Sequence, residues 1–211
     1  MFPITAHIRL GEVEKALAVL AAFEPLIPPD NAGFRAFIAS IHLLTGDKAK
    51  ARAELERAWE MVPERSAKIS VYGGSNILAM IAVKKQDGDK AGVKDLVERG
   101  LAFLDGRDAA NMTSSGNLRY RGWLLIYSDK AKEGLGFLRR GVEAGYGPNF
   151  MDDYVMKQFP DLDFAPILAI FEARRDVERG KFLTAVCNGE NPAPEIWTPS
   201  PETCEGHVKA E

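Results

Sequence analysis

Apolar residues recur at intervals of three and four along most of the chain, with polar and charged residues between them. This spacing places each apolar set on one face of a helix. The clearest stripes run from Ala16 to Phe23, Ala51 to Trp59, Leu96 to Leu104 and Leu135 to Val142. No stretch alternates apolar and polar residues for long enough to indicate a strand between turns. The pattern therefore predicts an all-α protein.

The placement of proline separates a helical body from a non-helical tail. None of the 12 prolines lies between Pro63 and Pro148, so long helices can run through this region. Near the C-terminus four prolines crowd together: Pro192, Pro194, Pro199 and Pro201. We therefore expect residues 187–211 to form an extended tail. Trp197 within it is expected to pack back on the body, rather than to anchor a partner.

The segment from Asn31 to Pro63 has the layout of a helical hairpin. An apolar helix from Phe34 to Leu44 ends at Gly46, and a second helix runs from Lys48 to Met61. A glycine at that turn can adopt the left-handed conformation that ends a helix. Small residues on the second helix let the two helices approach closely, and large apolar residues fill the remaining gaps.

The same skeleton recurs around four turn positions, Gly11, Gly46, Gly88 and Asp129. After each turn, a small or apolar residue follows five, nine and twelve positions later. We divide residues 1–147 into four helical hairpins, at 1–30, 31–63, 74–105 and 115–147. Extra residues at 64–74 and 106–116 are expected to form loops or longer helix starts.

The second hairpin resembles the tetratricopeptide repeat (TPR), a helix-turn-helix unit of about 34 residues. The resemblance is carried by a turn glycine, two small residues, a large apolar residue and a final proline: Gly46, Ala51, Ala58, Leu55 and Pro63. Ile38, Ala39 and His42 stand where the family usually has a leucine-glycine pair and an aromatic residue. The resemblance implies a right-handed α-α superhelix in which each hairpin closes the apolar face of its neighbour.

The last third of the chain departs from the repeat pattern. Residues 148–163 combine acidic and aromatic side chains and are expected to be irregular. A final helix is predicted from Phe164 to Val186, because Pro166 is tolerated in a first turn. Stacked hairpins need a cap at each end, so we interpret residues 148–186 as a linker and a capping helix.

Composition and charge narrow the function classes. Lys and Arg number 27 against 30 for Asp and Glu, so a net charge of -3 without a basic block disfavours nucleic acid as a partner. No apolar run is long enough to span a membrane. His7, His42 and His207 are too scattered for a metal site. We expect a soluble, cytoplasmic protein without metal or cofactor. Because the sequence shows no secretory signal, we expect Cys187 and Cys204 to be free thiols.

No catalytic motif is present. The chain has no glycine-rich phosphate loop, no nucleophile elbow and no His-Glu-x-x-His pattern. Asp152 and Asp153 are interpreted as solvated charge, because adjacent carboxylates rarely converge on one ligand. His42 is interpreted as a helix contact. The sequence therefore predicts a protein that is not an enzyme.

The most informative constellation is Arg119, Trp123 and Tyr127, whose steps of four place them on one helix face. In the TPR-like register this face lines a concave groove, where an arginine and two aromatics could bind a carboxylate and an apolar side chain together. The preceding hairpin would add further groove residues: Asn76, Leu78, Lys85 and Gln86. Burial of Trp123 and Tyr127 against the capping helix is the alternative.

The resemblance implies a non-enzymatic scaffold that binds a protein or peptide. The order of elements is also loosely similar to the C-terminal end of bacterial multidomain signalling proteins, in which a nucleotide cyclase or a winged-helix DNA-binding domain precedes the repeats. The short first helix, Pro3 to Leu10, motivates the alternative function of a regulatory or oligomerising segment of such a protein. Pairing of two copies as a homodimer stays open.

Overall fold

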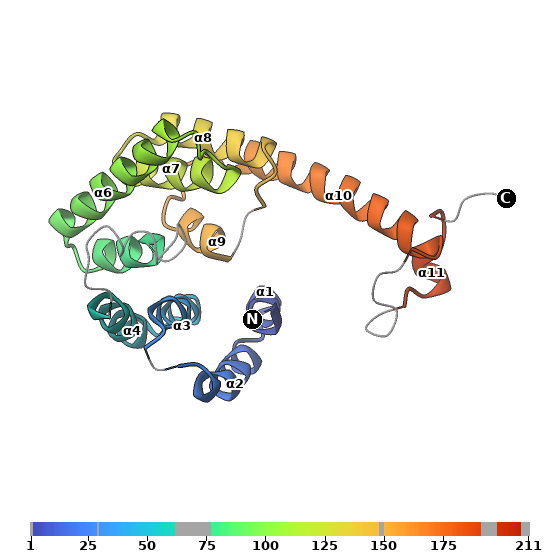
Figure 1. Ribbon diagram of the computed structural model, residues 1–211, viewed down its shortest axis with the longest axis horizontal. Coiled ribbons are helices and arrows are strands. Elements are labelled where there is room, and N and C mark those ends of the chain that lie inside the picture. Colours follow the sequence, from blue (N-terminus) through green and yellow to red (C-terminus); the bar gives the residue numbers. More distant parts are fainter. Residues whose placement is uncertain (1, 29, 62–76, 148–149, 191–197, 208–211) are drawn as a thin grey trace. The chain divides into compact units, whose positions relative to one another are not determined.

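The computed structural model describes residues 2–28, 30–61, 77–147, 150–190 and 198–207. Every regular element in these ranges is helical, which confirms the all-α prediction (Figure 1). The elements are α1 (Phe2–Arg9), α2 (Val13–Phe23), η1 (Glu24–Leu26), α3 (Ala32–Leu44), α4 (Lys48–Glu60), a helical segment at 77–86, α6 (Lys90–Ala109), α7 (Ser115–Tyr127), α8 (Ala131–Glu143), α9 (Phe150–Met156), α10 (Ala165–Cys187) and α11 (Pro201–Cys204). Two compact units divide the chain, Met1–Phe164 and Ala165–Glu211.

The four turns that join the two helices of each predicted hairpin share one backbone geometry. Gly11, Gly46, Gly88 and Asp129 have φ angles of 74°, 89°, 73° and 60°. At each turn, the amide of this residue donates to the carbonyl three positions earlier, and the next amide donates to the carbonyl five positions before itself. These are the two hydrogen bonds of a Schellman motif. The left-handed turn positions expected from the sequence are confirmed.

Each turn joins a first helix to a second helix. The first helices are α1, α3, the segment at 77–86, and α7; the second helices are α2, α4, α6 and α8. Within α4, Ala51, Leu55 and Ala58 are fully buried, as the repeat pattern requires of the side chains between paired helices. In α8 the residues at the same three positions after the turn, Gly134, Leu138 and Gly141, are buried too.

Two stretches of this unit differ from the expectation. The second helix α6 continues beyond Asp105 to Ala109 and ends at a turn where Asn111 has φ 55°. Part of the extra length at 106–116 therefore extends the preceding helix, because no proline stops it. Residues 150–156, expected to be irregular, form helix α9. The inserted stretch at 64–74 lies outside the described residues.

The second compact unit holds α10 and α11. Helix α10 begins and ends one residue later than the final helix predicted from Phe164 to Val186. The free-thiol expectation is wrong: Cys187 and Cys204 form a disulfide, with their Cα atoms 5.5 Å apart. A short helix also replaces part of the predicted extended tail, because Pro201 occupies a first-turn position after the N-cap Ser200. Trp197 lies outside the described residues. No helix in the described ranges is long and apolar enough to cross a membrane.

Candidate functional site

The structure buries the three side chains that the sequence placed in a groove. Arg119 is 4% exposed, Trp123 2% and Tyr127 8%. Leu78 is also buried, whereas Lys85 and Gln86 are exposed. Asn76 lies outside the described residues. The cover over these side chains is provided by the chain itself, through residues 150–164, which we call the closing segment.

A buried ion pair joins α7 to the closing segment. The Arg119 Nε atom donates to Asp152 Oδ1 at 2.6 Å, and the Trp123 indole N–H donates to the same oxygen. The Tyr146 hydroxyl donates to Asp152 Oδ2 at 3.3 Å. Asp152 is only 3% exposed, so its interpretation as solvated charge is wrong, while the neighbouring Asp153 is exposed. Helix α9 separates these adjacent carboxylates because successive helical side chains point about 100° apart.

The far end of the same α7 face holds the end of the closing segment. The Tyr127 hydroxyl donates to Gln158 Oε1 at 3.1 Å, and its ring meets Phe159 edge-on with centroids 5.2 Å apart. Lys85 Nζ lies 3.7 Å from the centroid of the Phe159 ring. Burial raises the pKa of the Tyr127 phenol and lowers the pKa of the Lys85 ammonium group. The aromatic pair and the cation together fix this end of the segment.

The closing segment makes further contacts with α7 and with the first helices of the other three hairpins. Gln86 Nε2 donates to the Tyr154 hydroxyl at 2.5 Å, and the Trp123 and Phe164 rings lie 5.6 Å apart. Helix α9 also contacts α1 and α3. Five of the seven predicted groove residues, Lys85, Gln86, Arg119, Trp123 and Tyr127, therefore contact the closing segment. Sequence reasoning grouped these side chains but did not find what lies on them.

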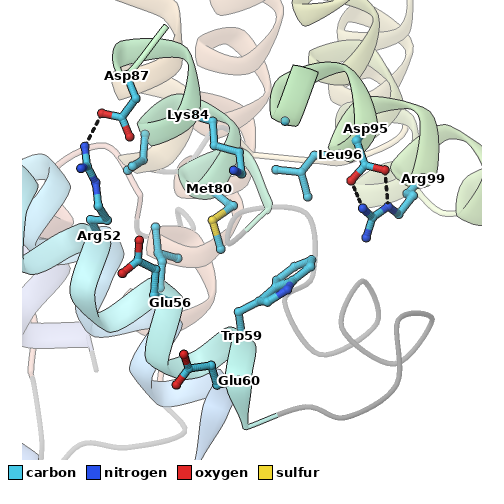
Figure 2. A pocket seen from close by; sticks show the side chains of 13 residues that line it. Arg52, Glu56, Trp59, Glu60, Met80, Lys84, Asp87, Asp95, Leu96 and Arg99 are labelled. Atoms are coloured by element: carbon cyan, nitrogen blue, oxygen red, sulfur yellow. Dashed lines mark hydrogen bonds and ion pairs between the residues drawn. The ribbon is translucent and has the colours of Figure 1, made fainter. Parts of the chain in front are cut away.

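Open cavities lie instead where a second helix faces the next hairpin. One of about 350 Å³, the α4–α6 cavity, is bounded by α4, residues 77–87 and α6. Figure 2 shows the Arg52–Asp87 ion pair at one edge and the Asp95–Arg99 ion pair at the other, with Trp59 between them. A second, of about 440 Å³, is bounded by α2, α3 and α4, and we call it the α2–α4 cavity.

The largest of these described cavities, about 790 Å³, lies between α6 and the turn that joins α7 to α8. Four lysines line it, Lys85, Lys90, Lys94 and Lys130, and we call it the lysine cavity. Its carboxylates are Glu98 and Asp129, and its remaining wall is largely aliphatic and aromatic. Two predicted groove residues, Lys85 and Tyr127, thus line an open cavity with one part of their surface.

The three cavities share one register. Each is lined by the residues six, nine, ten and thirteen positions after the preceding turn residue. In α4 these residues are Arg52, Leu55, Glu56 and Trp59. The equivalent residues are Leu17, Leu20 and Ala21 of α2 with Glu24 of η1, and Lys94, Val97, Glu98 and Leu101 of α6. The sequence analysis missed these sites, although the constant offsets from the turn residues are the signal that locates them.

Within the described residues, no group of three or more His, Cys, Asp or Glu side chains could hold a metal ion. The cavities combine charged and apolar side chains: the α4–α6 cavity is lined by both cations and carboxylates, and the lysine cavity has more cations than carboxylates. No family model matches the chain. No curated protein and no solved structure matches it either.

Proposed function

We propose that the chain is a non-enzymatic, TPR-like scaffold that binds protein partners. The observation that carries the proposal is the common register of the hairpins. Each of the four hairpin turns has a residue with positive φ and the same pair of hydrogen bonds, and three cavities are lined at the same offsets from three of those turns.

A shared register supports a stacked array in the following way. When the same positions of each second helix face the next hairpin, consecutive hairpins are related by similar displacements. The α2–α4 and α4–α6 cavities are alike in a second way, because the next hairpin lines both at equivalent positions. His42 in the first cavity corresponds to Lys84 in the second, and Glu54 corresponds to Leu96. Such arrays contact only their neighbours and present long, repetitive surfaces that suit recognition of extended partners.

The closing segment directs the partner to the second helices. A peptide that entered the face of the first helices would have to displace Asp152 from Arg119 and Trp123. Removing one partner of a buried ion pair costs about 3–5 kcal/mol, which is comparable with the binding energy of many peptides. The cavities along α2, α4 and α6 need no such displacement, so we place partner binding there.

Selection from a random peptide library against the full chain tests this function. We expect enriched peptides that bind one to one and slow amide hydrogen exchange in α2, α4 or α6, since a docked partner excludes water from the contacted helix. The Arg119→Ala variant serves as a comparison for the closed face. Failure to enrich any peptide would contradict the scaffold, and protection confined to α9 or α10 would contradict the proposed surface.

A further inference from the structure

We propose that the lysine cavity binds an acidic protein segment that carries one large apolar side chain. The proposal rests on the scaffold function and names the class of partner for one of its cavities. Its three supports are the unmatched positive charge at the rim, the position of that charge on two helix N-termini, and the apolar wall beneath it.

The rim has more cations than carboxylates to pair with them. The Lys94 Nζ atom lies 3.7 Å from Glu98 Oε1, and the Lys85 ammonium group lies over the Phe159 ring. Within the part of the chain that the structure describes, Lys90 and Lys130 form no ion pair, and both are exposed. An acidic segment would supply the carboxylates that these two lysines lack.

Both unpaired lysines stand at the start of a helix. Lys90 is the first residue of α6, and Lys130 is the N-cap of α8, where its side chain accepts no hydrogen bond from the first turn. A cation at a helix N-terminus opposes the helix dipole, so neither lysine is explained by helix stability. The N-cap Asp89 already places a carboxylate at the start of α6, so a bound carboxylate would interact favourably with both the lysine and the helix dipole at the start of α8.

The register-equivalent α4–α6 cavity shows that this surplus is not a general feature of the repeat. Its cations are paired: Arg52 with Asp87, Lys84 with Asp89 at 2.7 Å between Nζ and Oδ2, and Arg99 with Asp95. The two cavities are lined at the same four positions of their second helices, but only in the lysine cavity do two of the lining cations form no ion pair among the described residues.

The wall of the lysine cavity suits an apolar anchor. Val93, Val97, Leu101 and Ile126 line it from two helices, and Phe159 adds a ring. A volume of about 790 Å³ has room for a leucine or phenylalanine side chain together with part of its backbone. Buried anchors of this kind contribute most of the affinity at protein interfaces, while rim charges contribute selectivity and association rate.

The same charges favour an acidic peptide over nucleic acid. Glu98 and Asp129 lie among the lysines and would repel a closely spaced phosphate backbone. A peptide can place its carboxylates to meet Lys90 and Lys130 and avoid these two acids. The apolar wall also suits an aliphatic side chain of a peptide, and a phosphate backbone has no apolar group that could fill this place.

The test is fluorescence anisotropy with the full chain and a labelled peptide in which one leucine is flanked on both sides by glutamates. We expect saturable binding, and at least about tenfold weaker binding by the Lys90→Glu, Lys130→Glu variant. Replacing the leucine by serine, or the glutamates by glutamine, should weaken binding to a similar extent. Lys48→Glu is the matched control, because Lys48 holds the position in α4 that Lys90 holds in α6 and does not line the cavity.

Three outcomes would overturn the inference. One is the absence of saturable binding, and another is an equal loss of affinity in Lys48→Glu, which would indicate general charge attraction. The third is an oligothymidine that binds as tightly as the peptide with the same dependence on the two lysines. Each of the three would leave the scaffold function intact, provided that library-selected peptides still bind the chain.

Discussion

The hairpins α3–α4 and α7–α8 follow one register but pack their helices differently. Where α3 has Ala39, buried between the helices, α7 has Gly122 at the same distance before the turn. Where α4 has Ala51 and Ala58, α8 has Gly134 and Gly141. A Cβ atom on Gly134 would lie 2.6 Å from the Gly122 carbonyl oxygen, closer than such atoms approach. The turn thus determines which positions meet, and the size of the residues there determines how close the backbones come.

The first helices α3 and α7 also differ at the two positions through which α7 binds α9, and here α7 has the larger side chains. In α3 these two positions carry Ala36 and Ser40, both buried, and the Ser40 hydroxyl donates to the Ala36 carbonyl at 3.0 Å. At the equivalent positions α7 carries Arg119 and Trp123, which bind Asp152. Helix α9 contacts α3 as well, and Gln86 of the segment at 77–86 donates to Tyr154 of α9. One repeat position therefore serves close packing in one hairpin and polar attachment in another.

The largest expected effect comes from breaking the attachment that only α7 provides in this comparison. Asp152→Ala removes the carboxylate that pairs with the buried Arg119 guanidinium, and we expect the free energy of unfolding to fall by about 3–5 kcal/mol. Urea denaturation followed by circular dichroism measures the change.

Asp153→Ala is the matched control for that variant, because this neighbouring carboxylate is exposed on the same helix. We expect its effect to stay within about 0.5 kcal/mol. Replacing both members of the pair, with Arg119→Met and Asp152→Leu, should recover only part of the lost stability, because the buried Trp123 indole N–H still lacks its acceptor. Equal losses in the two single aspartate variants would contradict the buried role of Asp152.

A smaller effect is expected from making α8 like α4. Gly134→Ala adds a methyl group against the Gly122 carbonyl and the Ile126 side chain, both 2.6 Å away, so the helices must separate. We expect a loss of about 1–3 kcal/mol from overpacking. Gly136→Ala, two residues along the same helix, meets nothing within 4 Å and should gain about 0.5–1 kcal/mol through helix propensity. A stabilised Gly134→Ala would show that the glycines are not needed for close approach.

The repeat register was accessible from the sequence because backbone geometry limits which residues fit a turn. Gly11, Gly46 and Gly88 occupy left-handed conformations that glycine adopts without strain. Asp129 fits the same turn at a cost of about 1–2 kcal/mol and was found only because the surrounding spacing matched. Helical stripes were also predictable, since periodicity is a local property.

The closing segment was not accessible in this way because its partners are distant in the sequence. Asp152 meets Arg119 and Trp123 across 33 and 29 residues, and a charged seven-residue helix has no local pattern that marks it as buried. The spacing placed Arg119, Trp123 and Tyr127 on one face of α7, but it did not reveal the segment that covers them. The disulfide between Cys187 and Cys204 was missed for a related reason, because a separation of 17 residues does not reveal that α11 returns to the end of α10.

The smallest expected effect concerns an ionisable group that α3 has and α7 lacks. His42 lies four residues before its turn, where α7 has Leu125. Burial lowers the pKa of His42, partly opposed by the negative charge of Asp47. A lowered folded-state pKa means that the neutral imidazole favours folding. This contribution is complete above the unfolded-state value of about 6.5 and is lost as the pH falls through the folded-state value.

His42→Leu should therefore flatten the pH dependence of stability and make α3 resemble α7. We expect the free energy of unfolding of the variant, relative to the natural chain, to rise as the pH is lowered below about 6.5, because the leucine has no proton to bind. Urea denaturation at a series of pH values measures the difference, and subtraction of the two curves removes titrating groups common to both proteins. Parallel curves would show that His42 binds its proton equally well in the folded and unfolded chain. In that case its position beside the α2–α4 cavity would be as well hydrated as an exposed site.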